Sequence, residues 1–195
     1  EPLAVGLQAA EKAKIIPGES ALVMGCGPIG LVIALTALAG GCSKVFIADI
    51  VSKKLEMCKN YNNLIPIDLN KENPAEIVKK NTNNWGANII FEASGATKAY
   101  DVIFDSICPA GKVVIVGNPM NSIPMNFATL LTKEIEIKTV FRYAHQYERA
   151  INLLSSNKID VKPMITDTVA FDDSIKAFER AAKNLPEDVK IQIQL

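Results

Sequence analysis

Short apolar runs alternate with helical stretches over residues 1–140 of this chain. Runs typical of buried parallel strands lie at 20–24, 44–49, 65–67, 87–91 and 112–116. Charged and apolar residues alternate over 134–140, which is typical of a strand at a sheet edge. Stretches that predict helices lie at 2–14, 28–39, from 52 onward, 73–81, 97–107 and 127–133. The pattern predicts an α/β fold with a doubly wound, parallel six-stranded sheet of the Rossmann type.

Local signals refine three of these elements. Ser52 is expected to be a helix N-cap, because a serine hydroxyl can accept a hydrogen bond from a nearby backbone N–H. Pro66 should leave the run 65–67 with few ladder hydrogen bonds, since proline has no N–H to donate. Residues 109–111, Pro-Ala-Gly, predict a turn before the strand at 112–116.

The C-terminal part of the chain has a different pattern. Helices are expected at 146–156 and 172–183, with an irregular segment at 161–165 and a last strand at 189–193. In that strand apolar and polar residues alternate, as on an antiparallel sheet, and no partner sheet is expected within the chain. We therefore divide the chain into a helix plus Rossmann domain at 1–142 and a C-terminal helical and strand extension at 143–195.

The first apolar run leads into Gly25-Cys26-Gly27-Pro28-Ile29-Gly30 and then into a helical stretch. A G-x-G-x-x-G turn between strand and helix suits a pyrophosphate, because Gly27 permits close backbone approach and the helix N-terminus offers free N–H groups. Pro28 donates no N–H, so Ile29 and Gly30 are the better candidates for phosphate contact. Glycine-rich turns also serve the backbone alone, so context must decide.

That context is supplied by Asp49, which ends the second apolar run. A carboxylate at this place suits the hydroxyls of an adenosine ribose, and the alternative is a helix cap or a solvated loop acid. Strand, glycines, helix, strand and acid in this order favour dinucleotide binding. The pairs Ser94-Gly95 and Val116-Gly117 also follow predicted strands, where they would line the nicotinamide half of a cleft or serve as ordinary turns.

Composition narrows the function classes. The formal net charge is zero, with 21 Lys and Arg against 21 Asp and Glu, which does not favour nucleic acid or an anionic membrane. No uninterrupted apolar run is long enough to span a membrane. The four cysteines form no C-x-x-C pair and there is one histidine, so no local zinc cluster is expected. We expect reduced, buried thiols in a cytoplasmic protein.

Taken together, these motifs resemble the second half of a zinc-dependent medium-chain dehydrogenase of the sorbitol and xylitol (polyol) dehydrogenase group. The resemblance covers essentially all 195 residues. It is carried by Glu1-Pro2-Leu3, Gly25 to Gly30, Asp49 with Lys54, Glu92 to Gly95, Val114 to Gly117, Val140-Phe141-Arg142-Tyr143 and Asp160 to Thr166. The opening Glu-Pro-Leu and the Val-Phe-Arg-Tyr segment are the most specific.

The resemblance implies a role for each matched residue. NAD would be the cofactor, with its pyrophosphate on Gly25, Gly27 and Gly30, its ribose on Asp49, its adenine along Lys54, and its nicotinamide by Ile29, Val116, Gly117, Val140 and Phe141. Arg142 would lie near the substrate, with an ion pair near the hinge as the alternative. Glu1 matches a glutamate that approaches the catalytic zinc or its bound water.

The resemblance also implies what a full-length enzyme would add. Its main zinc ligands precede the Glu-Pro-Leu, so we expect this chain to be part of a larger protein and to hold no zinc itself. Residues 143–195 would return to that other domain, and the last strand is expected to be frayed, refolded or paired with a neighbour. The chain alone is expected to bind NAD without turnover.

The predicted activity of the full-length protein is oxidation of a sugar alcohol, of the sorbitol or xylitol type, to a ketose. One alternative is another medium-chain alcohol, threonine or butanediol dehydrogenase. The other is a non-catalytic NAD-binding or dimerisation module. The expected partners are a small polyol and a second copy of the chain, giving a homodimer or tetramer through strand 134–140.

Overall fold

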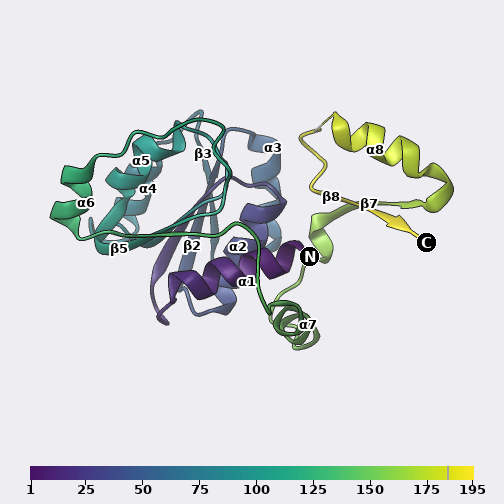
Figure 1. The fold of residues 1–195 in the computed structure, drawn as a ribbon, viewed down its shortest axis with the longest axis horizontal. Coiled ribbons are helices and arrows are strands. Elements are labelled where there is room, and N and C mark those ends of the chain that lie inside the picture. The colour runs from purple at the N-terminus through teal and green to yellow at the C-terminus, as the bar shows by residue number, and fades with distance from the viewer. Residues whose placement is uncertain (184) are drawn as a thin grey trace.

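A computed structural model describes residues 1–183 and 185–195, and its centre is a parallel six-stranded sheet in the order β3-β2-β1-β4-β5-β6 (Figure 1). Its strands are β1 (Ser20–Met24), β2 (Lys44–Asp49), β3 (Leu64–Asp68), β4 (Ala87–Glu92), β5 (Ile107–Ile115) and β6 (Glu136–Thr139). The accompanying helices are α1 (Pro2–Ala13), α2 (Pro28–Ala39), α3 (Ser52–Leu55), η1 (Glu56–Asn60), α4 (Pro74–Lys80), α5 (Ala99–Ser106) and α6 (Phe127–Lys133). This confirms the predicted doubly wound α/β fold.

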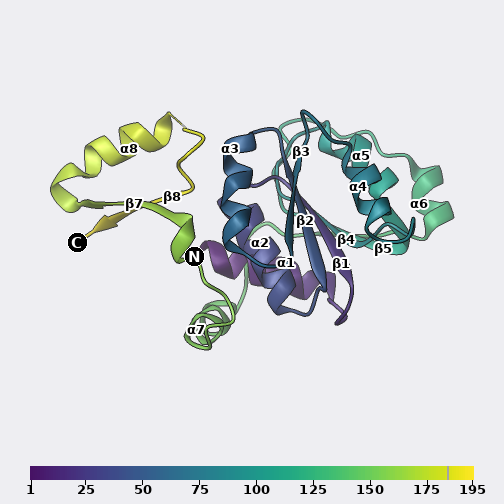
Figure 2. The same ribbon diagram turned by 180° about the vertical axis from the view of Figure 1, so that it is seen from behind.

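The buried central strands explain the two layers of helices. Along β1, Ala21 and Val23 belong to one apolar cluster and Leu22 and Met24 to another, because successive side chains point to opposite faces of a sheet. Helices α1 and α2 contribute to the first cluster, and α4 and α5 to the second. Figure 2 shows these helix pairs on opposite faces of the sheet.

Helix α1 packs directly on α2. A Cβ added at Gly6 would lie 2.8 Å from the carbonyl oxygen of Val32, so only a glycine permits this approach of the two backbones. The Thr36 hydroxyl donates a hydrogen bond to the Gly6 carbonyl at 3.0 Å across the same interface. These two contacts fix α1 against α2, the helix that begins at the glycine turn.

Two local predictions are corrected. Ser52 is the first residue of α3 and not its cap, because its hydroxyl donates instead to the Asp68 carboxylate at 2.6 Å. The turn predicted at 109–111 lies inside β5, where Ile107 pairs with Ala87 and pairing resumes between Lys112 and Ile89. The intervening residues loop out of the ladder while β5 continues. The prediction that 134–140 forms an edge strand is confirmed, since β6 ends the sheet.

The C-terminal segment contains α7 (Tyr147–Ser155), η2 (Lys162–Met164), β7 (Ile165–Ala170), η3 (Phe171–Asp173), α8 (Ser174–Ala182) and β8 (Lys190–Gln194). Strands β7 and β8 pair in parallel as a separate two-stranded sheet, and α8 lies between them in sequence. Both views show this unit beside the six-stranded sheet (Figures 1 and 2). The chain therefore holds a strand–helix–strand unit here, contrary to prediction.

The last strand also differs from prediction in its pairing. It was expected to lack a partner within the chain and to suit an antiparallel sheet, yet Ile193 lies opposite Val169 in a parallel ladder. Alternation reports burial on one face and carries no information about strand direction, which explains the error. Arg180 on α8 binds Asp167 and Asp188 and so ties the helix to both ends of the unit. The boundary between residues 142 and 143 stays a prediction.

None of the helices in the described ranges is both long and apolar enough to cross a membrane.

Candidate functional site

A cleft of about 1000 Å³ opens at the carboxyl ends of β1, β2 and β4. This is where the strand order reverses between β1 and β4, the point at which open parallel sheets bind ligands. Five residues predicted for the cofactor site line it: Gly25, Gly27, Asp49, Lys54 and Ser94. The remainder of the wall comes from 69–74, 96–99 and neighbouring residues. The structure thus joins three separate sequence motifs at one opening.

The three glycines of the turn have different physical roles. Gly25 has φ +105°, and its N–H donates to the Ala48 carbonyl at 2.8 Å. A Cβ at Gly30 would lie 1.8 Å from the Gly25 carbonyl oxygen, so α2 can approach the turn only through a glycine. At Gly27 no atom lies within 4 Å of a built Cβ. The fold therefore requires glycine at positions 25 and 30, whereas the space next to Gly27 holds no protein atom.

Helix α2 begins at this open space, with Gly27 as its N-cap and Pro28 as its first residue. The first N–H groups of a helix have no partner within the helix, and the N-terminus carries a partial positive charge. No acidic side chain lies in the first turn of α2. Ile29 and Gly30 follow Pro28 in this turn, and their N–H groups suit a bound anion.

Asp49 joins the end of β2 to the glycine turn. Its Oδ2 accepts the Cys26 N–H at 2.7 Å and its Oδ1 accepts the Val51 N–H at 2.8 Å. Each oxygen has a further lone pair, so the carboxylate can accept hydroxyl donors from the cleft as well. Lys54 lines the cleft from α3. The structural alternative for Asp49, a loop acid bound to nearby N–H groups, is thus part of its geometry and is compatible with ribose binding.

Glu92 organises the side of the cleft next to β4 and β5. Its carboxylate is buried and accepts the N–H of Ser94 at 2.8 Å and the N–H of Gly95 at 3.1 Å. Its carbonyl accepts the N–H groups of Val116 and Gly117 at 2.8 and 2.9 Å. Four predicted residues are thus held together by one that was not predicted as a site residue. The sequence signal that could have identified Glu92 was an acid at the end of a buried strand.

The residues predicted from the Val-Phe-Arg segment lie outside the lining of this cleft. Val140 continues from β6 and donates its N–H to the Ile115 carbonyl at 2.9 Å. Phe141 is 86% exposed, and the Arg142 guanidinium lies over its ring at 5.7 Å from the centroid. This structure therefore leaves Phe141 and Arg142 at the surface.

Glu1 precedes α1 and lies near two tyrosines that were not predicted as site residues. The hydroxyls of Tyr143 and Tyr147 are 3.2 Å apart. This hydrogen bond, with burial and the charge of Glu1 as further causes, raises the pKa of Tyr143 to about 12. Tyr143 was part of the Val-Phe-Arg-Tyr motif, so its position next to Arg142 was the signal that could have identified it.

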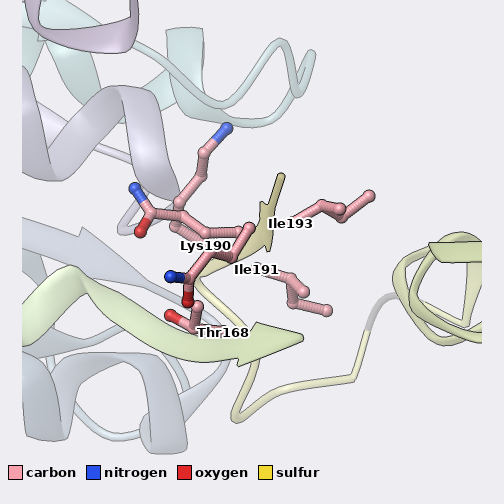
Figure 3. Close-up of a pocket in the computed structure, with 6 residues that line it drawn as sticks. Thr168, Lys190, Ile191 and Ile193 are labelled. Carbon is pink, nitrogen blue, oxygen red and sulfur yellow. The ribbon is translucent and has the colours of Figure 1, made fainter. Parts of the chain in front are cut away.

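A second hollow of about 530 Å³ lies against β8 (Figure 3), and no residue of the glycine turn lines it. It is lined by Thr168, Lys190, Ile191, Gln192, Ile193 and Gln194. None of the predicted site residues lies there, and its side chains include no acid or thiol. We therefore assign the candidate site to the cleft at the glycine turn, where the charged groups and helix terminus converge.

The residues that could bind metal are dispersed. Within 1–183 and 185–195 no three or more His, Cys, Asp or Glu side chains are grouped as ligands. The four cysteines are buried free thiols, as predicted for their burial, and the sulfurs of Cys26 and Cys58 are 3.9 Å apart. The hydrogen bond with the Cys58 thiol, and burial after it, raise the pKa of Cys26, which disfavours a metal-binding thiolate.

Comparison with known proteins places the chain among dehydrogenases. The family model described as zinc-binding dehydrogenase matches residues 28–156. A putative D-xylulose reductase of Rhizobium meliloti (strain 1021) is 46% identical over 195 residues, which are 100% of this chain and 56% of that protein. Sorbitol dehydrogenase of Bacillus subtilis (strain 168) is 32% identical over 194 residues, covering 99% of this chain and 55% of that protein.

Among solved structures, an Escherichia coli oxidoreductase/dehydrogenase of unknown specificity, ECK1772, superimposes with a TM-score of 0.91. It is 31% identical, and the match covers 100% of this chain and 56% of that chain. The chain thus spans about half the length of the curated relatives it matches. The matched family model and the identity to these relatives confirm the resemblance: the chain belongs to the zinc-binding dehydrogenase family.

Proposed function

We propose that this chain is the cofactor-binding part of an NAD-dependent, zinc-dependent polyol dehydrogenase that oxidises a sugar alcohol of the sorbitol or xylitol type to a ketose. The names of its relatives, D-xylulose reductase and sorbitol dehydrogenase, support the substrate class. The observation that carries the proposal is the open space at Gly27, in front of the α2 N-terminus and beside Asp49.

The residues present fit a dinucleotide. The pyrophosphate would lie against Gly27, where no protein atom would oppose it, and would accept N–H donors of Ile29 and Gly30. Asp49 would accept the adenosine ribose hydroxyls, and its charge would oppose the 2′-phosphate of NADP. Lys54 would lie along the adenine. When bound, NAD supplies the acceptor for the hydride removed from the alcohol.

Two backbone segments, 94–95 and 116–117, would form the nicotinamide end of the site. Glu92 holds Ser94 and Gly95 next to Val116 and Gly117 through its carboxylate and its carbonyl, and Ser94 lines the cleft. Ile29, Val140 and Phe141 would complete the surroundings of the ring. Such a wall orients the ring and excludes water, which are the protein's tasks in hydride transfer.

Arg142 and Glu1 are proposed for the substrate side, with Arg142 near the polyol and Glu1 near the reaction centre. A zinc ion does not fit the described part of the chain, because no cluster of ligands exists there. We therefore assign no step through zinc to these residues. In the full-length enzyme the zinc would be held by residues outside the matched half, and this chain alone would bind NAD without oxidising xylitol or sorbitol.

The test is calorimetric titration of the chain with NAD and NADP. Wild type should bind NAD in preference to NADP, and Asp49→Ala should weaken NAD binding at least about tenfold, because hydrogen bonds to a charged acceptor contribute about 1.5–3 kcal/mol. Asp105→Ala, which removes an exposed acid on α5, should change neither affinity.

Three results would contradict the proposal. A folded wild-type chain that binds neither dinucleotide would exclude a working cofactor site. An Asp49→Ala variant with unchanged NAD affinity would exclude Asp49 as the ribose ligand. Turnover of sorbitol or xylitol by the chain alone, at a rate comparable to a full-length relative, would refute the assignment of the chemistry to the full-length enzyme.

We also propose that two copies pair through β6. This strand ends the sheet, so one row of its backbone groups faces away from β5. Val140 donates its N–H to β5, and because backbone direction alternates along a strand, the N–H of Thr139 points outward. Ile135 and Ile137 pack against the apolar cluster of α4 and α5, which leaves backbone pairing as the basis for a dimer. A tetramer would require a further interface.

A further inference from the structure

Asp68 ends β3 beside Asp49, its register partner at the end of β2. The two strands are parallel neighbours, so both carboxylates lie at the same edge of the sheet. The Asp68 side chain is only 11% exposed, and the next N–H, of Leu69, donates to the Asp49 carbonyl at 3.0 Å. A second acid, Asp68, therefore lies next to Asp49, the proposed ribose ligand. The proposed function assigns no role to Asp68.

The Asp68 carboxylate accepts hydrogen bonds from the rim of the cleft, which we define as Ser52, Asn70 and Lys71. Its Oδ2 accepts the Ser52 hydroxyl at 2.6 Å and the Lys71 ammonium at 2.9 Å. Its Oδ1 accepts both the backbone N–H and the side-chain amide of Asn70, each at 3.1 Å. Asn70 and Lys71 line the cleft, so these donors stand at the opening but point to Asp68.

These donors keep the Asp68 carboxylate in its charged form. Hydrogen bonds from Ser52 first and Lys71 second hold the pKa of Asp68 well below its ordinary value, so the carboxylate is charged at neutral pH. Asp68 therefore holds three donors, the Ser52 hydroxyl, the Asn70 amide and the Lys71 ammonium, whereas Lys54 and Lys98 also line the cleft.

We propose that Asp68 is a specificity-determining positioning residue that withholds Ser52, Asn70 and Lys71 from the 2′-phosphate of NADP. This inference rests on the proposed dinucleotide site and deepens it: preference for NAD is set by two carboxylates. Asp49 occupies the ribose position itself. Asp68 retains the donors that a phosphate would need, since phosphate binding requires charge-assisted hydrogen bonds from just such groups.

Variants of Asp49 and Asp68 separate the contributions of the two carboxylates. Replacing Asp49 alone removes one repulsive charge but leaves Ser52, Asn70 and Lys71 bound to Asp68, so a 2′-phosphate gains none of these three donors. Replacing Asp68 as well releases the Ser52 hydroxyl and the Lys71 ammonium, whereas the Asn70 amide loses one bond and keeps its hydrogen bond to the Ile50 carbonyl at 2.6 Å. If Asp68 only stabilised the turn at 68–72, its loss would weaken binding of every adenosine nucleotide by the same factor.

The experiment titrates the chain by calorimetry with 5′-AMP, adenosine 2′,5′-bisphosphate and NAD, and follows folding by thermal unfolding. The variants are Asp49→Ser, Asp49→Ser with Asp68→Ser, and Asp49→Ser with Glu76→Gln. Glu76 lies in the first turn of α4 and does not line the cleft, so its variant is a matched control for loss of a second negative charge. Asp68→Asn replaces Asp68→Ser if the latter does not fold.

We expect the double Asp variant to bind the bisphosphate about tenfold more tightly than Asp49→Ser, the effect of one charge-assisted hydrogen bond. The Glu76 control should match Asp49→Ser, and adding Lys71→Ala to the double variant should remove most of the gain. No gain, an equal loss for 5′-AMP and bisphosphate, or a gain that survives Lys71→Ala would overturn the inference. A wild type that binds neither 5′-AMP nor NAD would instead refute the proposed function, and this inference with it.

Discussion

Alanine at Gly27 and alanine at Gly30 are expected to have opposite signatures, although both glycines belong to one short motif. At Gly27 a built Cβ meets no atom within 4 Å, and the backbone angles, φ −81° and ψ −177°, are open to any residue. At Gly30 the Cβ would lie 1.8 Å from the Gly25 carbonyl oxygen. The first substitution tests ligand space, and the second tests the fold.

The expected magnitudes follow from these distances. Gly27→Ala should change the free energy of unfolding by less than about 1 kcal/mol, because a modest loss in N-cap preference is offset by lower entropy of the unfolded chain. Its methyl group would displace a pyrophosphate from the α2 N-terminus. Loss of two N–H donors to phosphate, each contributing about 1.5 kcal/mol or more, should weaken NAD binding about hundredfold.

Gly30→Ala should lower both the free energy of unfolding and the affinity for NAD. The overlap with the Gly25 carbonyl forces the turn and α2 apart, and over-packing of this kind costs about 1–3 kcal/mol. For a domain of this size each kcal/mol lowers Tm by about 2–4 °C. The displaced turn should also lose NAD affinity.

Thermal unfolding and calorimetric titration with NAD on the same samples separate these outcomes. If Gly27→Ala bound NAD as tightly as wild type, the glycine turn could not be the pyrophosphate site. If Gly27→Ala unfolded as readily as Gly30→Ala, the inference that Gly27 faces open space would be wrong. Either result would refute the reasoning without reference to zinc or turnover.

Further predictions concern stability, pH and assembly. Tyr61 has a buried hydroxyl with no hydrogen-bond partner in the described residues, so Tyr61→Phe should raise the free energy of unfolding by about 1 kcal/mol in urea titrations. Burial also raises the pKa of Tyr61 to about 12, above the ordinary value near 10, so the unfolded chain ionises first and the free energy of unfolding should fall as pH rises from 10 toward 12. Tyr61→Phe should flatten this part of the stability profile; an unchanged profile would exclude Tyr61 as the cause. Lys112→Met should cost about 2 kcal/mol by leaving Glu19 unpaired where both side chains are only 14% exposed, whereas Lys176→Met in an exposed pair should cost less than about 1; equal costs in urea titrations would contradict this. Thr139→Pro removes an outward N–H of β6 and should shift a dimer to monomer in sedimentation, and an unshifted dimer would exclude pairing through this edge.

Most of the fold could be predicted because its signals are local. The buried strands at 20–24 and 44–49 are continuous apolar runs, and the glycine spacing from Gly25 to Gly30 is a property of six adjacent residues. The order of strand, turn, helix, strand and acid was enough to indicate where a dinucleotide would bind. These features depend on backbone freedom and side-chain polarity, which neighbouring residues alone determine.

Three of the missed features depend on partners distant in sequence. Ser52 has the right residue type for a cap, but its hydroxyl prefers the carboxylate of Asp68, which only the pairing of β2 with β3 brings close. The partner of β8 is β7, and alternation in one strand cannot reveal the direction of another. Glu92 likewise becomes a site organiser only when β5 brings Gly117 to it.

The sequence by itself thus determined the class of fold, the glycine turn and the acid at the end of β2. Each of these features depends on a short stretch of neighbouring residues, and the pattern of each stretch has few physical interpretations. Only the tertiary structure decided which glycine faces empty space, which donors at the rim are already bound to Asp68, and how the last strand is paired. Those outcomes depend on distances between segments, and distances are set by packing of the whole chain rather than by any local pattern.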